Sequence, residues 1–253
     1  MSVFLCLPAF NEEPSIRPLF ERIINLNNSF PDPKDRIKVV LYDDGSTDGT
    51  VATAEMFASD LDLVIIGNET NYGLGVAVRS LLQYFTTESS GDDVAVIMDC
   101  DDTHDPHQIP DILVALKQSD VVVASRYRRG SATSGVPFHR LFVSFGFMLL
   151  VKAVLPIKGV RDYSCGYRGY SSDILQRVSN LTDARFVEES GFAAMPELLW
   201  NCARAGARVG EIPMNLSYER KLSDSKMDVN DNTKRLLKLI VKLRMNGGSN
   251  PHG

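Results

Sequence analysis

The sequence contains few cysteines, and no two of them are spaced to act together. The four cysteines of the 253-residue chain are Cys6, Cys100, Cys165 and Cys202, and none forms a CxxC pair. Because the sequence also shows no secretory signal, these cysteines are predicted to be reduced thiols of the kind that is typical of cytosolic proteins.

A long apolar run, a basic leader and a positive net charge are also missing. The nearest candidate for a membrane span, LFVSFGFMLLV at 141–151, is shorter than the roughly 18 to 20 residues that a transmembrane helix needs. The N-terminal apolar run breaks at Asn11-Glu12-Glu13 with no basic segment before it, so we expect no signal peptide and a cytoplasmic location. The net charge of −5 disfavours binding to nucleic acid.

Short runs rich in valine and isoleucine alternate with helical patterns through the first half of the chain. Strands are predicted at 3–8, 37–44, 61–67, 93–99 and 120–125. Near-continuous apolar strands are typical of parallel sheets that are buried on both faces and joined by helices. The pattern predicts an α/β fold with a mostly parallel central sheet flanked by helices, in which ligands bind at the carboxyl ends of the strands.

The rhythm changes after residue 125. A basic loop, RYRRGSATSG, precedes an apolar helix at about 137–155, a strand within YSCGYRGYS, a helix within SGFAAMPELLWNCARAG and a final strand within ARVGEIPMNLSY. Residues 218–253 begin polar and contain TKRLLKLIVKLR, whose apolar positions have helical spacing. This segment predicts an amphipathic helix that either lies on a membrane or packs on the domain.

Acidic side chains crowd the end of the fourth predicted strand, in DCDDTHD at 99–105. Like charges this close repel unless a cation lies among them. Asp99 and Asp101 are two residues apart, so they point to the same side of an extended chain. Their hard oxygens suit Mg²⁺ or Mn²⁺, and no thiolate or multi-histidine set accompanies them to favour zinc. We expect Asp105 to begin a helix and Asp102 to be a solvated loop carboxylate.

Two further polar clusters end the first and second predicted strands, PAFNEE at 8–13 and DDGSTDGT at 43–50. A carboxylate at a strand end can accept hydrogen bonds from a nucleotide, which makes Asp43 and Asp44 candidate ligands. A turn alone would also explain the glycine, serine and aspartate content. NYGLG at 71–75 lacks the third glycine of a dinucleotide fingerprint and is predicted to be a turn before a helix. Three clusters at three carboxyl ends predict one shared crevice.

These motifs, in this order and spacing, resemble the family 2 glycosyltransferases of GT-A fold. The motifs that carry the resemblance are LPAFNEE, YDDGSTDGT, NYGLG, MDCDDTHDP and ASRY. The second half resembles the dolichyl- and polyprenyl-phosphate mannose synthases through Arg126, Arg140 with Ser144, DYSCGYRGY, PELLWNCARAGARVGEIP, and Arg220 followed by SDSKM. The resemblance covers about residues 2–227.

The resemblance implies a GT-A catalytic domain at 1–217, followed by a C-terminal arm and amphipathic helix at 218–253. The nucleotide-binding half spans about 1–125 and the acceptor half about 126–217. Two positions depart from the family pattern, because Thr103 stands where these synthases often carry glutamine and Ser223 stands where they commonly carry glycine.

The resemblance also implies roles for individual residues. The metal, Mg²⁺ or Mn²⁺, is held by Asp99 and Asp101 on the donor diphosphate. The implied donor-binding residues are Pro8, Asn11, Glu12, Asp43, Asp44, Asp99 and Asp101. The implied acceptor-phosphate ligands are Arg126, Arg140, Ser144, Arg220 and Lys226, and guanidinium forks fit phosphate oxygens well. The implied catalytic residues are Asp101, Arg126 and Arg140.

The expected reaction is an inverting, metal-dependent transfer of a hexose, mannose from GDP-mannose, to a polyprenyl phosphate at the cytoplasmic face of a membrane. A lipid phosphate is already anionic at pH 7, so the attack needs no strong general base. Glu197 is then expected to be a structural partner of a nearby arginine, and Asp162 and Arg168 to brace the acceptor strand. One alternative is an enzyme of the same fold that uses a UDP-sugar or a non-lipid acceptor in cell-surface or capsular glycan synthesis. Another is a non-catalytic nucleotide-sugar-binding protein.

Overall fold

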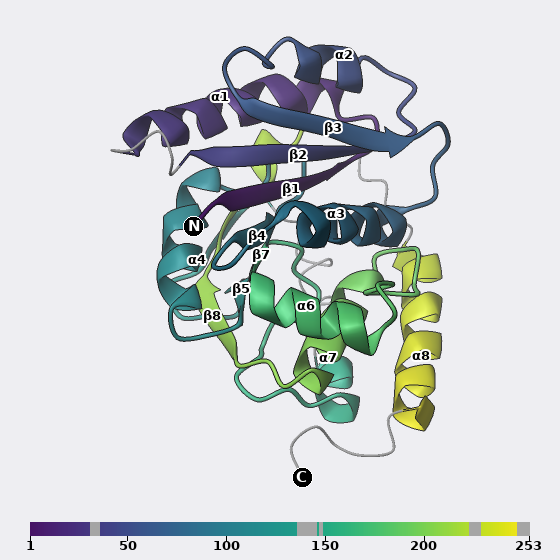
Figure 1. The fold of residues 1–253 in the computed structure, drawn as a ribbon. Helices are drawn as coiled ribbons and strands as arrows, with labels where there is room; N and C mark the ends of the chain where they lie inside the picture. The colour runs from purple at the N-terminus through teal and green to yellow at the C-terminus, as the bar shows by residue number, and fades with distance from the viewer. Residues whose placement is uncertain (31–35, 136–145, 147–148, 223–228, 247–253) are drawn as a thin grey trace.

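The computed structural model describes residues 1–30, 36–135, 146, 149–222 and 229–246 of the chain (Figure 1). A seven-stranded sheet has the strand order β3-β2-β1-β4-β7-β5-β8. β7 is antiparallel to β4 and β5, and the other neighbours are parallel. The predicted mostly parallel sheet is therefore confirmed. Its strands are β1 (Val3–Ala9), β2 (Ile37–Asp44), β3 (Asp62–Asn68), β4 (Val94–Ile97), β5 (Val121–Ser125), β7 (Arg168–Ser171) and β8 (Val209–Pro213).

Helices flank this sheet, as the alternating pattern predicts. α3 packs against β1 and β2, α4 packs against β5, β7 and β8, and α6 and α7 pack against α3. Figure 1 shows α6 and α7 below α3, with α8 running alongside them in yellow. The helices are α1 (Glu13–Ser29), α2 (Thr50–Glu55), α3 (Leu74–Glu88), α4 (Ile109–Leu116), α6 (Ser172–Leu181), α7 (Ala194–Arg204) and α8 (Val229–Asn246), with short 3₁₀ turns η2 (Pro106–Gln108) and η3 (Tyr218–Arg220).

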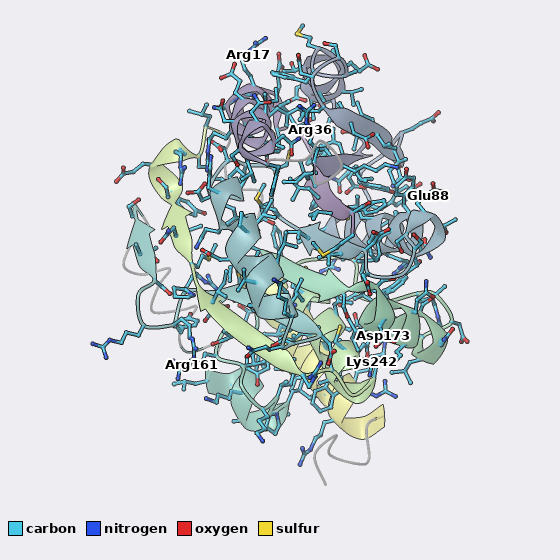
Figure 2. The ribbon with its side chains drawn as sticks, turned by 60° about the vertical axis from the view of Figure 1, so that its left-hand side comes forward. Arg17, Arg36, Glu88, Arg161, Asp173 and Lys242 are labelled. Atoms are coloured by element: carbon cyan, nitrogen blue, oxygen red, sulfur yellow. The ribbon has the colours of Figure 1, made fainter. Side chains whose placement is uncertain are left out.

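The apolar spacing of each element explains its place. β4 is buried along its whole length, whereas β3, at the edge of the sheet, is half-exposed. α1 buries Ile16, Leu19, Phe20 and Ile23, the spacing of one helical face. Charged side chains such as Arg17, Glu88 and Arg161 lie at the periphery of the molecule (Figure 2).

The predicted final strand is divided in two, which is a correction to the sequence-based prediction. β8 ends at Pro213, and β9 (Asn215–Ser217) pairs with β6 (Ala132–Ser134) in a separate two-stranded sheet. Between them Met214 is buried, and its N–H donates to Ser125 O at 3.2 Å. This break carries the chain across the carboxyl ends of the main strands, where η3 follows.

α8 adopts the second of the two predicted arrangements, with an apolar face packed on the domain. Leu236, Leu239, Ile240 and Leu243 are buried. Arg235 forms an ion pair with Glu189 at 3.0 Å, which ties the helix to the loop before α7. Of the predicted helix at 137–155, residues 149–154 are helical and most of the rest lies outside the described residues. Within the described ranges, no helix is long and apolar enough to cross a membrane.

Candidate active site

A cavity of about 560 Å³ lies at the carboxyl ends of β1, β2, β4 and β5. The three polar clusters meet there, because the cavity is lined by Glu12, Asp44, Asp99 and Asp101. The lining also includes Arg126, directly after β5, and Lys221, directly after η3. The shared crevice that the strand ends predict is therefore present.

The loop after β4 fixes Asp101 by local hydrogen bonds. Asp101 Oδ1 accepts from the Thr103 N–H at 3.2 Å and from Thr103 Oγ1 at 2.7 Å. Asp102, between them, has a φ of 59°, a left-handed conformation that aspartate tolerates better than most residues. Thr103, the departure from the family pattern, thus holds the Asp101 carboxylate in place.

His104 contacts both the backbone and the side chain of Asp99. The Asp99 N–H donates to His104 Nδ1 at 3.3 Å, which leaves the ring proton on Nε2, 3.7 Å from Asp99 Oδ2. The imidazole is stacked on the Tyr167 ring, with centroids 5.2 Å apart. The Asp99 side chain is 41% exposed whereas that of Asp101 is 14% exposed, so Asp99 is the more accessible carboxylate of the two.

The electrostatics of the two carboxylates differ. Enclosure in the cavity wall raises the pKa of Asp99, and the neighbouring charge of Asp101 adds to the rise. Burial alone would raise the pKa of Asp101 as well, but the Lys221 ammonium, which donates to Asp101 Oδ2, holds that pKa below its ordinary value. Asp101 is therefore ionised throughout the neutral range.

Arg22 of α1 neutralises the other half of the acidic stretch. Its guanidinium donates to Asp102 Oδ1, to Asp105 Oδ1 at 2.9 Å and to the His104 carbonyl at 3.2 Å. The expectation that Asp102 is solvated is wrong, because the residue is 3% exposed. The expectation for Asp105 is confirmed, since its side chain accepts from the His107 N–H at the start of η2.

We predict that Arg22→Met lowers the free energy of unfolding by about 2 kcal/mol, because three charge-assisted hydrogen bonds are lost and Asp102 stays buried. Chemical denaturation at neutral pH measures this change. Arg17→Met, one turn earlier on α1, is the matched control: its side chain is 59% exposed and its ion pair with Glu21 spans 4.0 Å. Equal stability of the two variants would contradict the role of Arg22.

Of the predicted donor-binding residues, Pro8, Glu12, Asp44, Asp99 and Asp101 line the cavity. Asp44 accepts from the N–H groups of Tyr72 at 3.0 Å and Gly73 at 2.7 Å, which shapes the turn before α3. The predicted turn in NYGLG is thereby confirmed.

Asn11 and Asp43 organise the neighbouring loop. Asn11 Oδ1 accepts from the Thr47 N–H at 2.7 Å, and Asp43 Oδ1 accepts from the Ser46 N–H at 3.2 Å. Both residues therefore hold the DDGSTDGT loop beside the cavity. A direct contact of either with a nucleotide stays a prediction.

Arg126, a predicted acceptor-phosphate ligand, is oriented by a buried carboxylate. Asp162 is fully buried and accepts from Arg126 Nε and Nη2, each at 2.8 Å, and Nη2 also donates to Ser164 Oγ at 2.7 Å. Burial would raise the pKa of Asp162, but Arg126 holds it below its ordinary value. Asp162 thus fixes the guanidinium at the cavity wall.

The other predicted acceptor residues are Arg220 and three residues that the structure does not describe. Arg220 closes η3, and among the described residues its buried Nε meets no hydrogen-bond acceptor. Arg140, Ser144 and Lys226 lie outside the described residues. The acceptor-phosphate role of all four stays a prediction.

Two expected supporting residues are found deeper in the domain. Arg168 is fully buried and donates to Met195 O at 2.7 Å and Tyr163 O at 2.6 Å, which braces β7 against α7. Glu197 accepts from the N–H groups of Glu188 and Glu189, at 3.1 and 2.8 Å, so among the described residues its hydrogen-bond partners are backbone amides and not the expected arginine.

Two of the positively charged residues at this site, Arg22 and Lys221, were not predicted from the sequence. Arg22 is 80 residues from Asp102, and Lys221 is 120 residues from Asp101. The sequence feature that points to Lys221 is its position directly after Arg220, a predicted acceptor-phosphate ligand. No spacing in α1 singles out Arg22.

Asp99 and Asp101 have the chemistry of a divalent-ion site completed by other ligands. In the described part of the chain, no group of three or more histidine, cysteine, aspartate or glutamate side chains is arranged to hold a metal ion. Mg²⁺ is commonly bound by one or two carboxylates together with water and substrate phosphates. Two carboxylates in the wall of an open cavity fit that coordination.

Comparisons with known proteins give consistent matches. The family model described as "Glycosyl transferase family 2" matches residues 4–179. An undecaprenyl-phosphate mannosyltransferase of Micrococcus luteus is 30% identical over 228 residues, which cover 90% of this chain and 88% of the relative. A polyprenol monophosphomannose synthase of Mycolicibacterium smegmatis is 29% identical, over 87% of this chain and 79% of the relative.

Solved structures share the fold. Glucosyl-3-phosphoglycerate synthase from Mycobacterium tuberculosis, in complex with Mn²⁺, UDP and glucosyl-3-phosphoglycerate, superposes with a TM-score of 0.64 at 20% sequence identity. The match covers 96% of this chain and 78% of that one. The same protein has been solved with Mg²⁺ and UDP, and that structure superposes with a TM-score of 0.60. At this identity the likeness establishes the GT-A fold.

Proposed function

Because the chain belongs to glycosyltransferase family 2, we propose that it transfers mannose from GDP-mannose to a polyprenyl phosphate and inverts the anomeric carbon. The observation that carries the proposal is the cavity itself. Its lining includes two carboxylates suited to a metal–diphosphate and a guanidinium suited to an acceptor phosphate. The relatives named as mannosyltransferases support mannose and a polyprenyl phosphate as the substrates.

The chain's own residues account for positioning and charge neutralisation. Asp99 and Asp101 would hold a divalent ion, Mg²⁺ or Mn²⁺, which as a Lewis acid would stabilise the leaving diphosphate. Pro8, Glu12 and Asp44 line the part of the cavity that we assign to the nucleotide. Since Asp162 and Ser164 engage Nε and Nη2 of Arg126, we assign its Nη1 to the acceptor phosphate. Arg140, Ser144, Arg220 and Lys226 complete the proposed phosphate ligands.

An ionised phosphate oxygen is already a competent nucleophile at neutral pH. The site therefore needs to align this oxygen with the anomeric carbon and offset the charge of two phosphorylated substrates. Glu197, bound to backbone amides, is assigned no catalytic part. We also propose that the enzyme acts as a peripheral protein at the cytoplasmic face of a membrane, and the lipid nature of the proposed acceptor supports the membrane contact.

A donor panel tests the proposal. The enzyme is incubated with Mn²⁺, a short polyprenyl phosphate and GDP-mannose, UDP-glucose or UDP-GlcNAc, and release of the nucleoside diphosphate is measured. We expect release from GDP-mannose, dependent on the polyprenyl phosphate. Release from a UDP-sugar instead would favour the alternative glycosyltransferase, and release from none would favour a non-catalytic binding protein.

A further inference from the structure

Lys221 reaches from the C-terminal arm into the acidic wall of the cavity. Its ammonium donates to Asp101 Oδ2, and the two side chains are only 13% and 14% exposed. This ion pair occupies the carboxylate to which the proposed function assigns a metal ion.

Strand β9, directly before the arm, is fixed to the loop at 99–105, and this places Lys221 beside Asp101. The Ser217 N–H donates to Thr103 O at 3.0 Å, and Leu216 forms an antiparallel bridge with His104. The Lys221 N–H donates to Tyr218 O at 3.2 Å, which closes the η3 turn. The ammonium also lies 5.8 Å from the centre of the Tyr218 ring.

The charges around the cavity explain why Lys221 lies there. The carboxylates of Glu12, Asp99 and Asp101 place several negative charges close to the Lys221 ammonium. The guanidinium of Arg22 is engaged by Asp102 and Asp105, and that of Arg126 by Asp162. Lys221 supplies a positive charge at Asp101, where a divalent ion would supply it in the loaded enzyme.

Both oxygens of the Asp101 carboxylate are already engaged. Oδ1 accepts two hydrogen bonds from Thr103, and Oδ2 accepts from Lys221. A carboxylate oxygen in a strong ammonium hydrogen bond is a poor ligand for a second cation, because the two positive charges repel at this distance. Asp99 is more exposed and has a weaker partner in His104, at 3.7 Å.

We propose that Lys221 is a tethered counter-ion that a divalent metal must displace from Asp101, and that Lys221 thereby sets the metal affinity of the site. The inference rests on the proposed metal site at Asp99 and Asp101. Asp99 would offer the ion the more exposed of the two carboxylates, and binding at Asp101 would require the ammonium to leave. Loading of the metal is thus coupled to release of the arm at 218–222, which carries Arg220 toward the proposed acceptor phosphate.

Mn²⁺ binding without nucleotide tests the exchange. The free ion is counted by electron paramagnetic resonance during titration of wild type, Lys221→Met and Lys221→Arg. We expect Lys221→Met to lower the Mn²⁺ dissociation constant about tenfold, because a charge-assisted hydrogen bond no longer competes. Lys221→Arg retains the charge and should bind like wild type.

Lys242→Met is the matched control. Lys242 also forms an ion pair, with Glu188, but neither residue lines the cavity. Its dissociation constant for Mn²⁺ should equal that of wild type. Equal or weaker binding by Lys221→Met, compared with wild type, would overturn the exchange.

Asp101→Asn separates failure of the inference from failure of the metal site. If Asp101→Asn loses Mn²⁺ binding while Lys221→Met binds like wild type, the metal site stands and the exchange is refuted. If none of these proteins binds Mn²⁺, the metal site and the exchange with Lys221 are both refuted.

Hydrogen exchange supplies a second readout that is independent of affinity. Mn²⁺ should accelerate amide exchange in peptides covering 216–222 of wild type. The same peptides of Lys221→Met should exchange fast before any metal is added. Exchange that Mn²⁺ leaves unchanged in wild type would contradict release of the arm.

Discussion

Asp101→Asn is expected to lower kcat by about a thousandfold or more, the scale of losing a principal electrostatic contact to the leaving group. The substitution removes the charge of one of the two proposed metal ligands. It preserves the local fold, because the asparagine oxygen can still accept from Thr103, as Asp101 Oδ1 does. Steady-state rates with GDP-mannose, polyprenyl phosphate and Mn²⁺ measure the change.

Asp111→Asn provides the control for loss of one carboxylate. Asp111 lies exposed in the first turn of α4, and its replacement should leave kcat unchanged. Circular dichroism of both variants should match that of wild type. Retention of most of the activity by Asp101→Asn would remove the basis of the metal assignment.

Asp162→Asn is expected to lower the free energy of unfolding by about 3 to 5 kcal/mol, the range for breaking a buried ion pair by removing one partner. Asp162 accepts from Arg126 through two side-chain nitrogens and from the N–H groups of Ser164 and Cys165. The variant leaves a guanidinium with no matching charge and loosens the loop that precedes β7. Denaturant unfolding at neutral pH measures the loss.

The pH dependence of this effect has a defined sign. The pKa of Asp162 is lowered in the folded protein, so its contribution to stability is fully present above the unfolded pKa of about 3.9. That contribution disappears as the pH falls through the lower folded value. The stability difference between wild type and Asp162→Asn should therefore narrow below about pH 4.

Asp173→Asn is the control for this comparison. Asp173 is 75% exposed and pairs with Arg177 at 2.9 Å on α6, so its loss should cost less than about 1 kcal/mol. If Asp162→Asn were no less stable than Asp173→Asn, Asp162 could not be the anchor of Arg126.

The strand ends are the part of the site that sequence predicts best. Each parallel strand is a continuous apolar run, so the polar residues after it mark its carboxyl end directly. Asp44, Asp99 and Asp101 line one cavity for this reason. The place of β7 could not be predicted in the same way, because YSCGYRGYS looks like a strand but its antiparallel insertion between β4 and β5 depends on distant partners.

The positively charged residues of the site also could not be predicted, because their partners are distant in the sequence. An ion pair such as Arg22–Asp102 or Lys221–Asp101 leaves no local pattern, since its two members lie on segments that only the tertiary fold brings together. Helix α8 illustrates a related ambiguity. Its periodicity predicts an apolar face, but the burial of Leu236 and Ile240 against the domain is decided by the rest of the protein.

The most direct test of the account is the mass of the lipid after reaction with GDP-mannose. We predict that a polyprenyl phosphate gains one hexose for each GDP released, and that the matching polyprenol, which lacks the phosphate, gains none. Release of GDP with free mannose and an unchanged lipid, or transfer to the polyprenol, would contradict it.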